Sequence, residues 1–330
     1  MSLALHTAPR GPIAVHEVAP RDGLQMESMF VPTDDKVAWI DELSGLGYDK
    51  IEVTSFTSPA AIPALQDAEA VMRRIRRAPG VVYTALVPNA RGAERAIDAR
   101  TDEFNLVMSA SATHNLANLR MTQAQSLRTL TEVITLARQS HVAVNVSLSC
   151  AFGCPMEGPV PADTVLDWVE RFSALGVRDF TLCDTTGMAD PGQVLALCSA
   201  AVQDDPELRF TAHFHDTRAL AGANVFAALQ AGITRFDASL GGIGGCPYAP
   251  GASGNVATED LVHLLQRLGH TTGPQLSGLT AAADHLAALL GHELPSAIRR
   301  AGPSTQRHPV PADFEQIRAK ALAREAAQPA

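Results

Sequence analysis

The sequence has little positive charge. Lysine and arginine number 26 against 35 aspartates and glutamates, which gives a formal net charge of -9. A protein that binds nucleic acid or an anionic membrane surface needs a basic face. We therefore expect neither nucleic acid nor a membrane as a partner. The one basic cluster, residues 73–77, is better explained as the solvated end of a helix.

Disulfide-framework spacing and long apolar runs are also missing. The five cysteines are Cys150, Cys154, Cys183, Cys198 and Cys246. Their odd number and scattered positions favour a reduced compartment. Residues 1–11 contain no apolar segment typical of a signal peptide, and no apolar run reaches the length that spans a membrane. We expect a cytoplasmic protein.

Hydrophobic residues make up 46% of the chain and charged residues only 18%, which indicates a large core without disordered charge blocks. Strand-like segments alternate with segments of helical period along most of the chain. The expected strands are 13–18, 50–54, 81–87, 103–108, 142–148, 178–183, 208–213 and 233–239. They begin roughly 25 to 40 residues apart, the spacing of parallel strands joined by crossover helices.

Eight such units predict an α/β protein with a (β/α)8 TIM barrel and additional C-terminal helices. We expect an N-terminal tail over residues 1–12 and the TIM-barrel catalytic domain over residues 13–270. A C-terminal helical extension and tail, with helices at 276–290 and 313–324, should occupy residues 271–330.

In a TIM barrel, chemistry takes place at the C-terminal ends of the strands and in the loops that follow them. Several polar groups of this sequence fall at those positions: Arg21, Asp22, Glu52, Asn89, Ser109, Cys150, Asp184, His213, His215 and the stretch 246–255. Because separate clusters converge on one face of the barrel, we predict a single site there.

His213 and His215 indicate that this site holds a metal ion. Residues i and i+2 of a strand point to the same side, so the two imidazoles project together. A satisfied core or surface histidine is the alternative for each. The oxygen donors available are Asp22, Asn255 and Glu52. Imidazoles combined with oxygen ligands suit a divalent cation, Mg²⁺ or Mn²⁺, while zinc and iron stay open.

The charged residues near the predicted metal site can act on the substrate or on one another. Arg21 can stabilise negative charge that develops on a substrate oxygen, or it can form an ion pair with Glu52 or Asp184. Asp184 and Glu17 are predicted to orient the metal ligands from behind. Together with Arg21, we expect Gln25, Ser55 and Asn89 to contact the substrate, since they follow three expected strands.

Cys246 lies in the glycine-rich stretch 241–255, a composition that suits sharp bends or close approach to a ligand better than a helix or strand. We expect its thiol to act as a nucleophile or to move a proton. A small buried apolar residue is the alternative, but the glycines around it offer little to bury it.

Five motifs occur at the expected loops: RDGLQ at 21–25, EVTS at 52–55, SCAFGCP at 149–155, HFHDT at 213–217 and GGCPYAPGASGN at 244–255. With these motifs the chain resembles the 3-hydroxy-3-methylglutaryl-CoA lyases, members of the DRE-TIM metallolyase superfamily. The likeness extends from about residue 15 to residue 269. The GGCP loop is highly specific to the lyases, whereas the superfamily shares RDG and HxH.

The resemblance implies a metal-dependent carbon–carbon lyase. Asp22, His213, His215 and Asn255 would bind Mg²⁺ or Mn²⁺. The ion would chelate the hydroxyl and carboxylate of an acyl-CoA substrate. Retro-Claisen cleavage of 3-hydroxy-3-methylglutaryl-CoA would then give acetoacetate and the enolate of acetyl-CoA.

Further roles come from the same resemblance. Arg21 would stabilise the enolate and Cys246 would assist proton transfer, while Glu52, Asp184 and Glu259 would orient these groups. Arg218 and Met26 depart from the usual pattern near the mouth of the site. A related 3-hydroxyacyl-CoA with a different acyl group is therefore an alternative substrate.

Two other functions are alternatives to the lyase. A Claisen condensing enzyme of the isopropylmalate or citramalate synthase type shares RDG and HxH, but typically lacks the GGCP loop and carries a further C-terminal domain. A non-catalytic relative that binds metal and CoA is disfavoured because all the chemical groups are present. A homo-oligomer is left open.

Overall fold

A computed structural model describes residues 10–245 and 254–327. The internal contacts divide the chain into two compact units, Met1–Arg300 and Ala301–Ala330.

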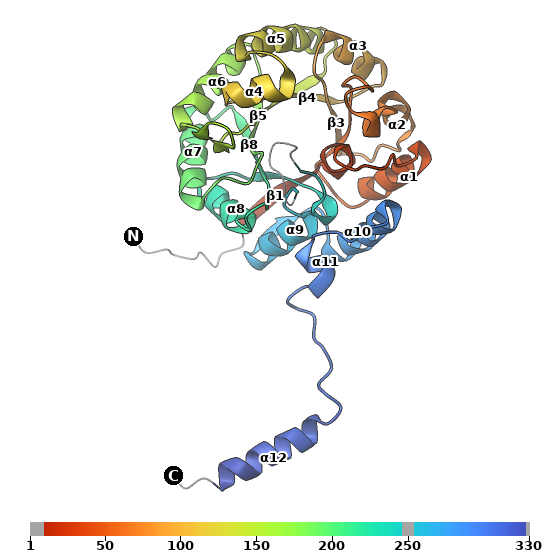
Figure 1. Cartoon of the computed structure of the whole chain (residues 1–330), viewed down its shortest axis with the longest axis vertical. Helices are drawn as coiled ribbons and strands as arrows, with labels where there is room; N and C mark the ends of the chain where they lie inside the picture. The colour runs from red at the N-terminus through yellow and green to blue at the C-terminus, as the bar shows by residue number, and fades with distance from the viewer. Residues whose placement is uncertain (1–9, 246–253, 328–330) are drawn as a thin grey trace. The chain divides into compact units, whose positions relative to one another are not determined.

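The first unit is built around a closed barrel of parallel strands, as predicted (Figure 1). Its eight strands are β1 (Arg10–Glu17), β2 (Lys50–Ser55), β3 (Val82–Leu86), β4 (Glu103–Ser109), β5 (Ala143–Ser149), β8 (Asp179–Asp184), β9 (Arg209–Phe214) and β10 (Arg235–Ala238). Each strand pairs with the next in this order, and β10 pairs with β1 to close the ring. The C-terminal ends of all eight strands consequently meet at one face.

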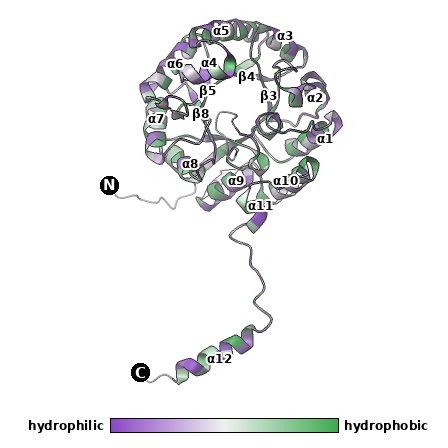
Figure 2. Cartoon of the chain, in the orientation of Figure 1, coloured by the Kyte–Doolittle hydropathy of each residue, from purple (hydrophilic) through white to green (hydrophobic). Residues whose placement is uncertain are grey.

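Helices surround the strands in a ring (Figure 1). They are α1 (Thr33–Ser44), α2 (Ala68–Arg74), α3 (Ala90–Asp98), α5 (Gln123–Gln139), α6 (Ala162–Ala174), α7 (Pro191–Asp204), α8 (Ala221–Gln230) and α9 (Thr258–Arg267). A further helix, α4 (Ala112–Leu119), lies inside this ring, next to β4 and α5 (Figure 1). Local sequence sets several of their ends. Thr122 and Asp190 cap α5 and α7 through capping boxes. Most ring helices carry both hydrophobic and hydrophilic residues, as expected for one face on the sheet and one in solvent (Figure 2).

Smaller elements complete the first unit. They are η1 (Ala19–Gly23), η2 (Pro63–Leu65), the hairpin of β6 (Gly153–Cys154) and β7 (Gly158–Pro159), η3 (Leu240–Gly242), β11 (His270–Thr272), α10 (Leu276–Leu290) and α11 (Ala297–Ala301). The boundary predicted after residue 270 falls inside this unit. The reason is that β11 pairs with the start of β1 and α10 buries Leu279 and Leu286.

The second unit contains α12 (Phe314–Ala326), which has no buried residue. Phe314 and Ile317 are among its exposed hydrophobic residues. Across the portion of the chain that the structure describes, no helix combines the length and the apolar character needed to cross a membrane.

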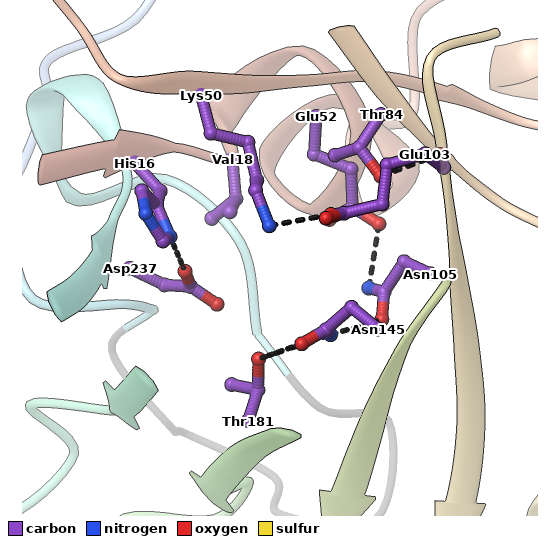
Figure 3. Close-up of a pocket in the computed structure, with 10 residues that line it drawn as sticks. All are labelled: His16, Val18, Lys50, Glu52, Thr84, Glu103, Asn105, Asn145, Thr181 and Asp237. Carbon is purple, nitrogen blue, oxygen red and sulfur yellow. Dashed lines mark hydrogen bonds and ion pairs between the residues drawn. The ribbon is translucent and has the colours of Figure 1, made fainter. Parts of the chain in front are cut away.

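The core and the barrel interior differ in character. Between strands and helices the packing is apolar, with Ile51, Val53, Leu106 and Phe180 fully buried. Inside the barrel, where branched apolar residues usually dominate, polar side chains line a small cavity with room for about one water molecule. Its lining residues are His16, Val18, Lys50, Glu52, Thr84, Glu103, Asn105, Asn145, Thr181 and Asp237 (Figure 3).

Candidate metal centre

Three side chains predicted as metal ligands converge at the C-terminal end of the barrel. Asp22, His213 and His215 each offer a ligand atom, and these atoms all lie within 4.8 Å of one another. Asp22 sits in η1, directly after β1, where its backbone N–H donates to Val18 O at 2.7 Å. His213 lies in β9 and His215 just beyond its end, both buried. Strand alternation therefore brings the imidazoles together as the sequence predicts.

Asn255 joins this group through its backbone and its side chain. It forms an antiparallel bridge with His215. Its Nδ2 donates to Asp22 Oδ2 at 2.7 Å and to Ile243 O at 3.1 Å. Its Oδ1 is buried and accepts no hydrogen bond from the described residues. Buried amide oxygens nearly always have a partner, so a carboxylate, two imidazoles and an unpaired amide oxygen together fit a divalent cation.

The ionisation of these groups also suits metal binding. Burial, followed by the charge of His213, lowers the pKa of His215 to about 3, so this imidazole is neutral at pH 7 and keeps a free lone pair. Burial works to raise the pKa of Asp22, but Arg21 and the two histidines outweigh it and lower that pKa. The Asp22 side chain is therefore anionic at neutral pH.

Arg21 bridges two carboxylates next to the ligand group. Its Nη1 donates to Asp22 Oδ1 at 2.5 Å and its Nη2 to Glu52 Oε2 at 2.6 Å. The predicted ion pair with Glu52 is present. Glu52 in turn accepts a hydrogen bond from Asn105 Nδ2 at 2.8 Å, so Glu52 holds Arg21 in a fixed orientation. Arg21 Nε is buried and donates to no described residue, so its N–H is not committed to another group.

Glu17 and Glu259 hold the backbone around the glycine-rich segment. Glu17 accepts four hydrogen bonds, from Ala19 N, Leu240 N, Tyr48 Oη and Thr258 Oγ1. Glu259 Oε2 accepts from Gly241 N at 2.8 Å. Burial raises the pKa of each carboxyl to about 7. These hydrogen bonds orient the start of the glycine-rich segment; none of them reaches a metal ligand.

Asp184 has a similar local role at the end of β8. Its carboxylate accepts from Met188 N at 2.7 Å and from Ala189 N at 3.1 Å, which shapes the loop after the strand. Burial raises its pKa to about 6. No hydrogen bond between Asp184 and the four grouped ligands is found in the described part of the chain.

The residues predicted to contact the substrate differ in whether their side-chain atoms already have a hydrogen-bond partner. Gln25 Oε1 is buried and has no partner among residues 10–245 and 254–327. Ser55 Oγ lies 2.8 Å from Thr57 Oγ1, so it serves the turn after β2. Asn89 is exposed, and its Oδ1 caps α3 by accepting from Gly92 N. Cys246 lies outside the described residues.

Two residues at the site were missed from the sequence. Asp237, on β10, lies with its Oδ2 3.3 Å from Nδ1 of His213, and His16, on β1, contacts the same carboxylate. The available signal was an aspartate in the middle of a strand, flanked by the buried Phe236 and Ala238. Aspartate is uncommon within strands. Its presence at this position therefore indicates a side chain that faces a polar interior.

Comparison with known proteins places the chain among lyases. A family model described as HMGL-like matches residues 12–286. Hydroxymethylglutaryl-CoA lyase YngG of Bacillus subtilis is 44% identical over 284 residues, which cover 86% of this chain and 95% of that protein. The (R)-citramalyl-CoA lyase of Chloroflexus aurantiacus is 42% identical over 301 residues, 88% of this chain and 95% of that protein.

A solved structure is similar over nearly the whole chain. It is the HMG-CoA lyase of Acinetobacter baumannii in complex with coenzyme A and 3-methylmalate, which is 48% identical with a TM-score of 0.87. The match covers 91% of this chain and 98% of that one.

Proposed function

Because the chain belongs to the HMGL-like family, we propose that it is a carbon–carbon lyase that cleaves 3-hydroxy-3-methylglutaryl-CoA to acetoacetate and acetyl-CoA. The observation that carries this proposal is the unpaired, buried Asn255 Oδ1 beside Asp22, His213 and His215. The names of the similar proteins supply the substrate.

The four side chains would hold one divalent cation, Mg²⁺ or Mn²⁺. Two oxygen ligands and two imidazoles leave positions open for substrate, as a catalytic site requires. Bound there, the ion supplies Lewis acidity to the substrate's oxygen atoms.

Arg21 acts on the charge that the reaction develops. The C3 hydroxyl of the substrate loses its proton, C3 becomes a carbonyl carbon, and the C2–C3 bond breaks. The electron pair of that bond passes to the thioester as an enolate. Arg21 stabilises the enolate oxygen with an N–H that its two carboxylate partners leave free. Cys246 assists the proton transfer that completes acetyl-CoA.

A second substrate has an observation in its favour. The relative that is 42% identical is named as a lyase of (R)-citramalyl-CoA, whose carboxylate lies one carbon nearer to the hydroxyl. Arg218, in the loop after β9, donates from Nη1 to Thr186 O and Gly187 O and so joins the loops after β8 and β9. A cation at this position differs from the usual lyase motif and could meet a substrate carboxylate.

We place the protein in the cytoplasm. Support comes from Cys154, Cys183 and Cys198, which are buried and form no disulfide within the described residues. A reducing compartment preserves such thiols.

A substrate panel tests the proposal. The purified protein with Mg²⁺ or Mn²⁺ receives 3-hydroxy-3-methylglutaryl-CoA, citramalyl-CoA and straight-chain 3-hydroxyacyl-CoA, and mass spectrometry identifies the products. We expect acetoacetate and acetyl-CoA from the first. If citramalyl-CoA is the one thioester cleaved, giving pyruvate and acetyl-CoA, then citramalyl-CoA is the substrate and 3-hydroxy-3-methylglutaryl-CoA is not. Release of free CoA from acetyl-CoA and a 2-oxo acid would instead indicate a condensing enzyme, and no reaction with any thioester would overturn the lyase.

A further inference from the structure

Three titratable residues form a row across neighbouring strands of the barrel. His16 on β1 is the register partner of Asp237 on β10, and Asp237 is the register partner of His213 on β9. Register partners in a parallel sheet project to the same face. His16 and Asp237 both line the interior cavity (Figure 3), so the row lies inside the barrel and ends at the metal centre.

The carboxylate of Asp237 is shared between the two imidazoles. Its Oδ1 lies 3.0 Å from Nδ1 of His16 and its Oδ2 lies 3.3 Å from Nδ1 of His213. An ionised carboxylate only accepts hydrogen bonds, so both Nδ1 atoms carry the proton and donate. The side chains of His16 and His213 are 4% and 9% exposed. Water therefore competes little for these bonds.

The contact has a consequence for metal binding. With Nδ1–H committed to Asp237, the lone pair of His213 is on Nε2, and the ring cannot turn without losing the bond. Nδ1 of His215, by contrast, is buried and lacks a hydrogen-bond partner in the described residues. Its backbone is instead fixed by the bridge to Asn255. The two imidazoles are thus restrained in different ways, and only one depends on Asp237.

We propose that Asp237 is a positioning residue for the metal centre, which it serves by fixing the tautomer and ring orientation of His213, and that His16 holds Asp237 in place for this role. The inference rests on the proposed function only in requiring that His213 binds a metal ion. Neither residue needs to touch the substrate.

The test measures metal affinity without turnover. The protein is stripped with a chelator and titrated with Mn²⁺, followed by electron paramagnetic resonance of the free ion. Asp237→Asn keeps the shape but can offer the two imidazoles only one accepting oxygen. We expect it to bind Mn²⁺ about 10- to 100-fold more weakly than the parent. Thr211→Val, on β9 two residues before His213 and on the same face, is the matched control and should bind like the parent.

Variants of His16 separate its hydrogen bond from its bulk. In His16→Asn the side-chain Nδ2 replaces Nδ1 as donor to Asp237, so Mn²⁺ affinity should stay near that of the parent. His16→Leu has no donor, and its affinity should fall in the same direction as that of Asp237→Asn, by a smaller factor. A general packing defect would not distinguish the two variants in this way.

Thermal unfolding of the metal-free variants accompanies each titration. Folded Asp237→Asn that binds Mn²⁺ as tightly as the parent overturns the inference and leaves the proposed function standing. If Asp237→Asn does not fold, the His16 pair decides, and equal affinities for His16→Leu and His16→Asn overturn it. A parent that binds no Mn²⁺ overturns the proposed function and this inference together.

Discussion

Asn255 donates its side-chain amide to the carboxylate of Asp22 at 2.7 Å, across 233 positions of the sequence. This bond decides which end of the amide faces the metal centre. Because Nδ2 is occupied by Asp22 and Ile243 O, only Oδ1 is free to bind a cation.

Gly244→Ala should weaken metal binding. Gly244 has φ of 114°, and a Cβ there would lie 2.5 Å from Asn255 Nδ2 and 3.5 Å from Asp22 Oδ2. The substitution displaces the amide from Asp22, and we expect Mn²⁺ affinity to fall about tenfold or more. Gly80→Ala is the matched control, since Gly80 also has positive φ (85°) but open space around its Cβ position. Equal affinities in both variants would contradict the role of Asn255.

His213→Ala should remove the metal and the activity together. One of two imidazole ligands is lost, and Asp237 keeps an unpaired oxygen in the interior. We expect metal content after purification, measured by inductively coupled plasma mass spectrometry, to fall to background along with turnover. Full metal content with lost turnover would mean that His213 acts on the substrate and is not a ligand.

Arg21→Lys should lower kcat. Lysine keeps the charge, but its compact ammonium cannot bridge Asp22 and Glu52 while presenting a third N–H in the same plane. Loss of one such donor to a developing oxyanion reduces kcat by about 10²- to 10³-fold. Arg74→Lys, in a surface ion pair with Asp34, is the control and should turn over like the parent.

Cys246→Ala tests the proposed proton transfer. We expect turnover of the CoA thioester to fall by about 10²- to 10⁴-fold, while metal content stays that of the parent. Cys198→Ala, at a buried position in α7, controls for loss of a thiol. Equal turnover of Cys246→Ala and the parent would remove Cys246 from the mechanism.

Glu259→Gln should change how stability depends on pH. Burial raises the pKa of Glu259 from 4.5 to about 7, so the folded state takes up a proton that the unfolded state lacks between these values. Its contribution to stability is present below about pH 4.5 and is lost as pH rises through 7.

Glutamine cannot ionise and still accepts from Gly241 N. From pH 5 to pH 7.5, the free energy of unfolding of Glu259→Gln should gain roughly 1–3 kcal/mol relative to the parent, measured by urea titration. A difference that does not vary with pH would show that Glu259 has an ordinary pKa.

Much of the fold was predictable from local pattern. The eight strand segments were expected within a few residues of their observed ends, because apolar runs, helical period and glycines mark each unit. The HMGL-like match and the B. subtilis relative confirm the family named from the motifs. The proximity of the His213 and His215 side chains was predictable from strand alternation.

The rest depends on contacts between distant residues. His16 and Asp237 meet only because β1 closes the barrel against β10, and their contact spans 221 positions. The pairing of β11 with β1 also joins residues from opposite ends of the sequence. No local sequence pattern predicts the register between strands that are this far apart in the sequence.

The pairing of β1 with β10 also determines at which stage of synthesis the metal centre can form. Asp22 follows the first strand and Asn255 follows the last, so the two proposed ligands lie on either side of the β1–β10 pairing. A nascent chain on the ribosome that has only its first seven strands would still lack Asn255 and could not form the complete metal centre. Metal uptake would then wait until synthesis has passed residue 255 and the ring has shut.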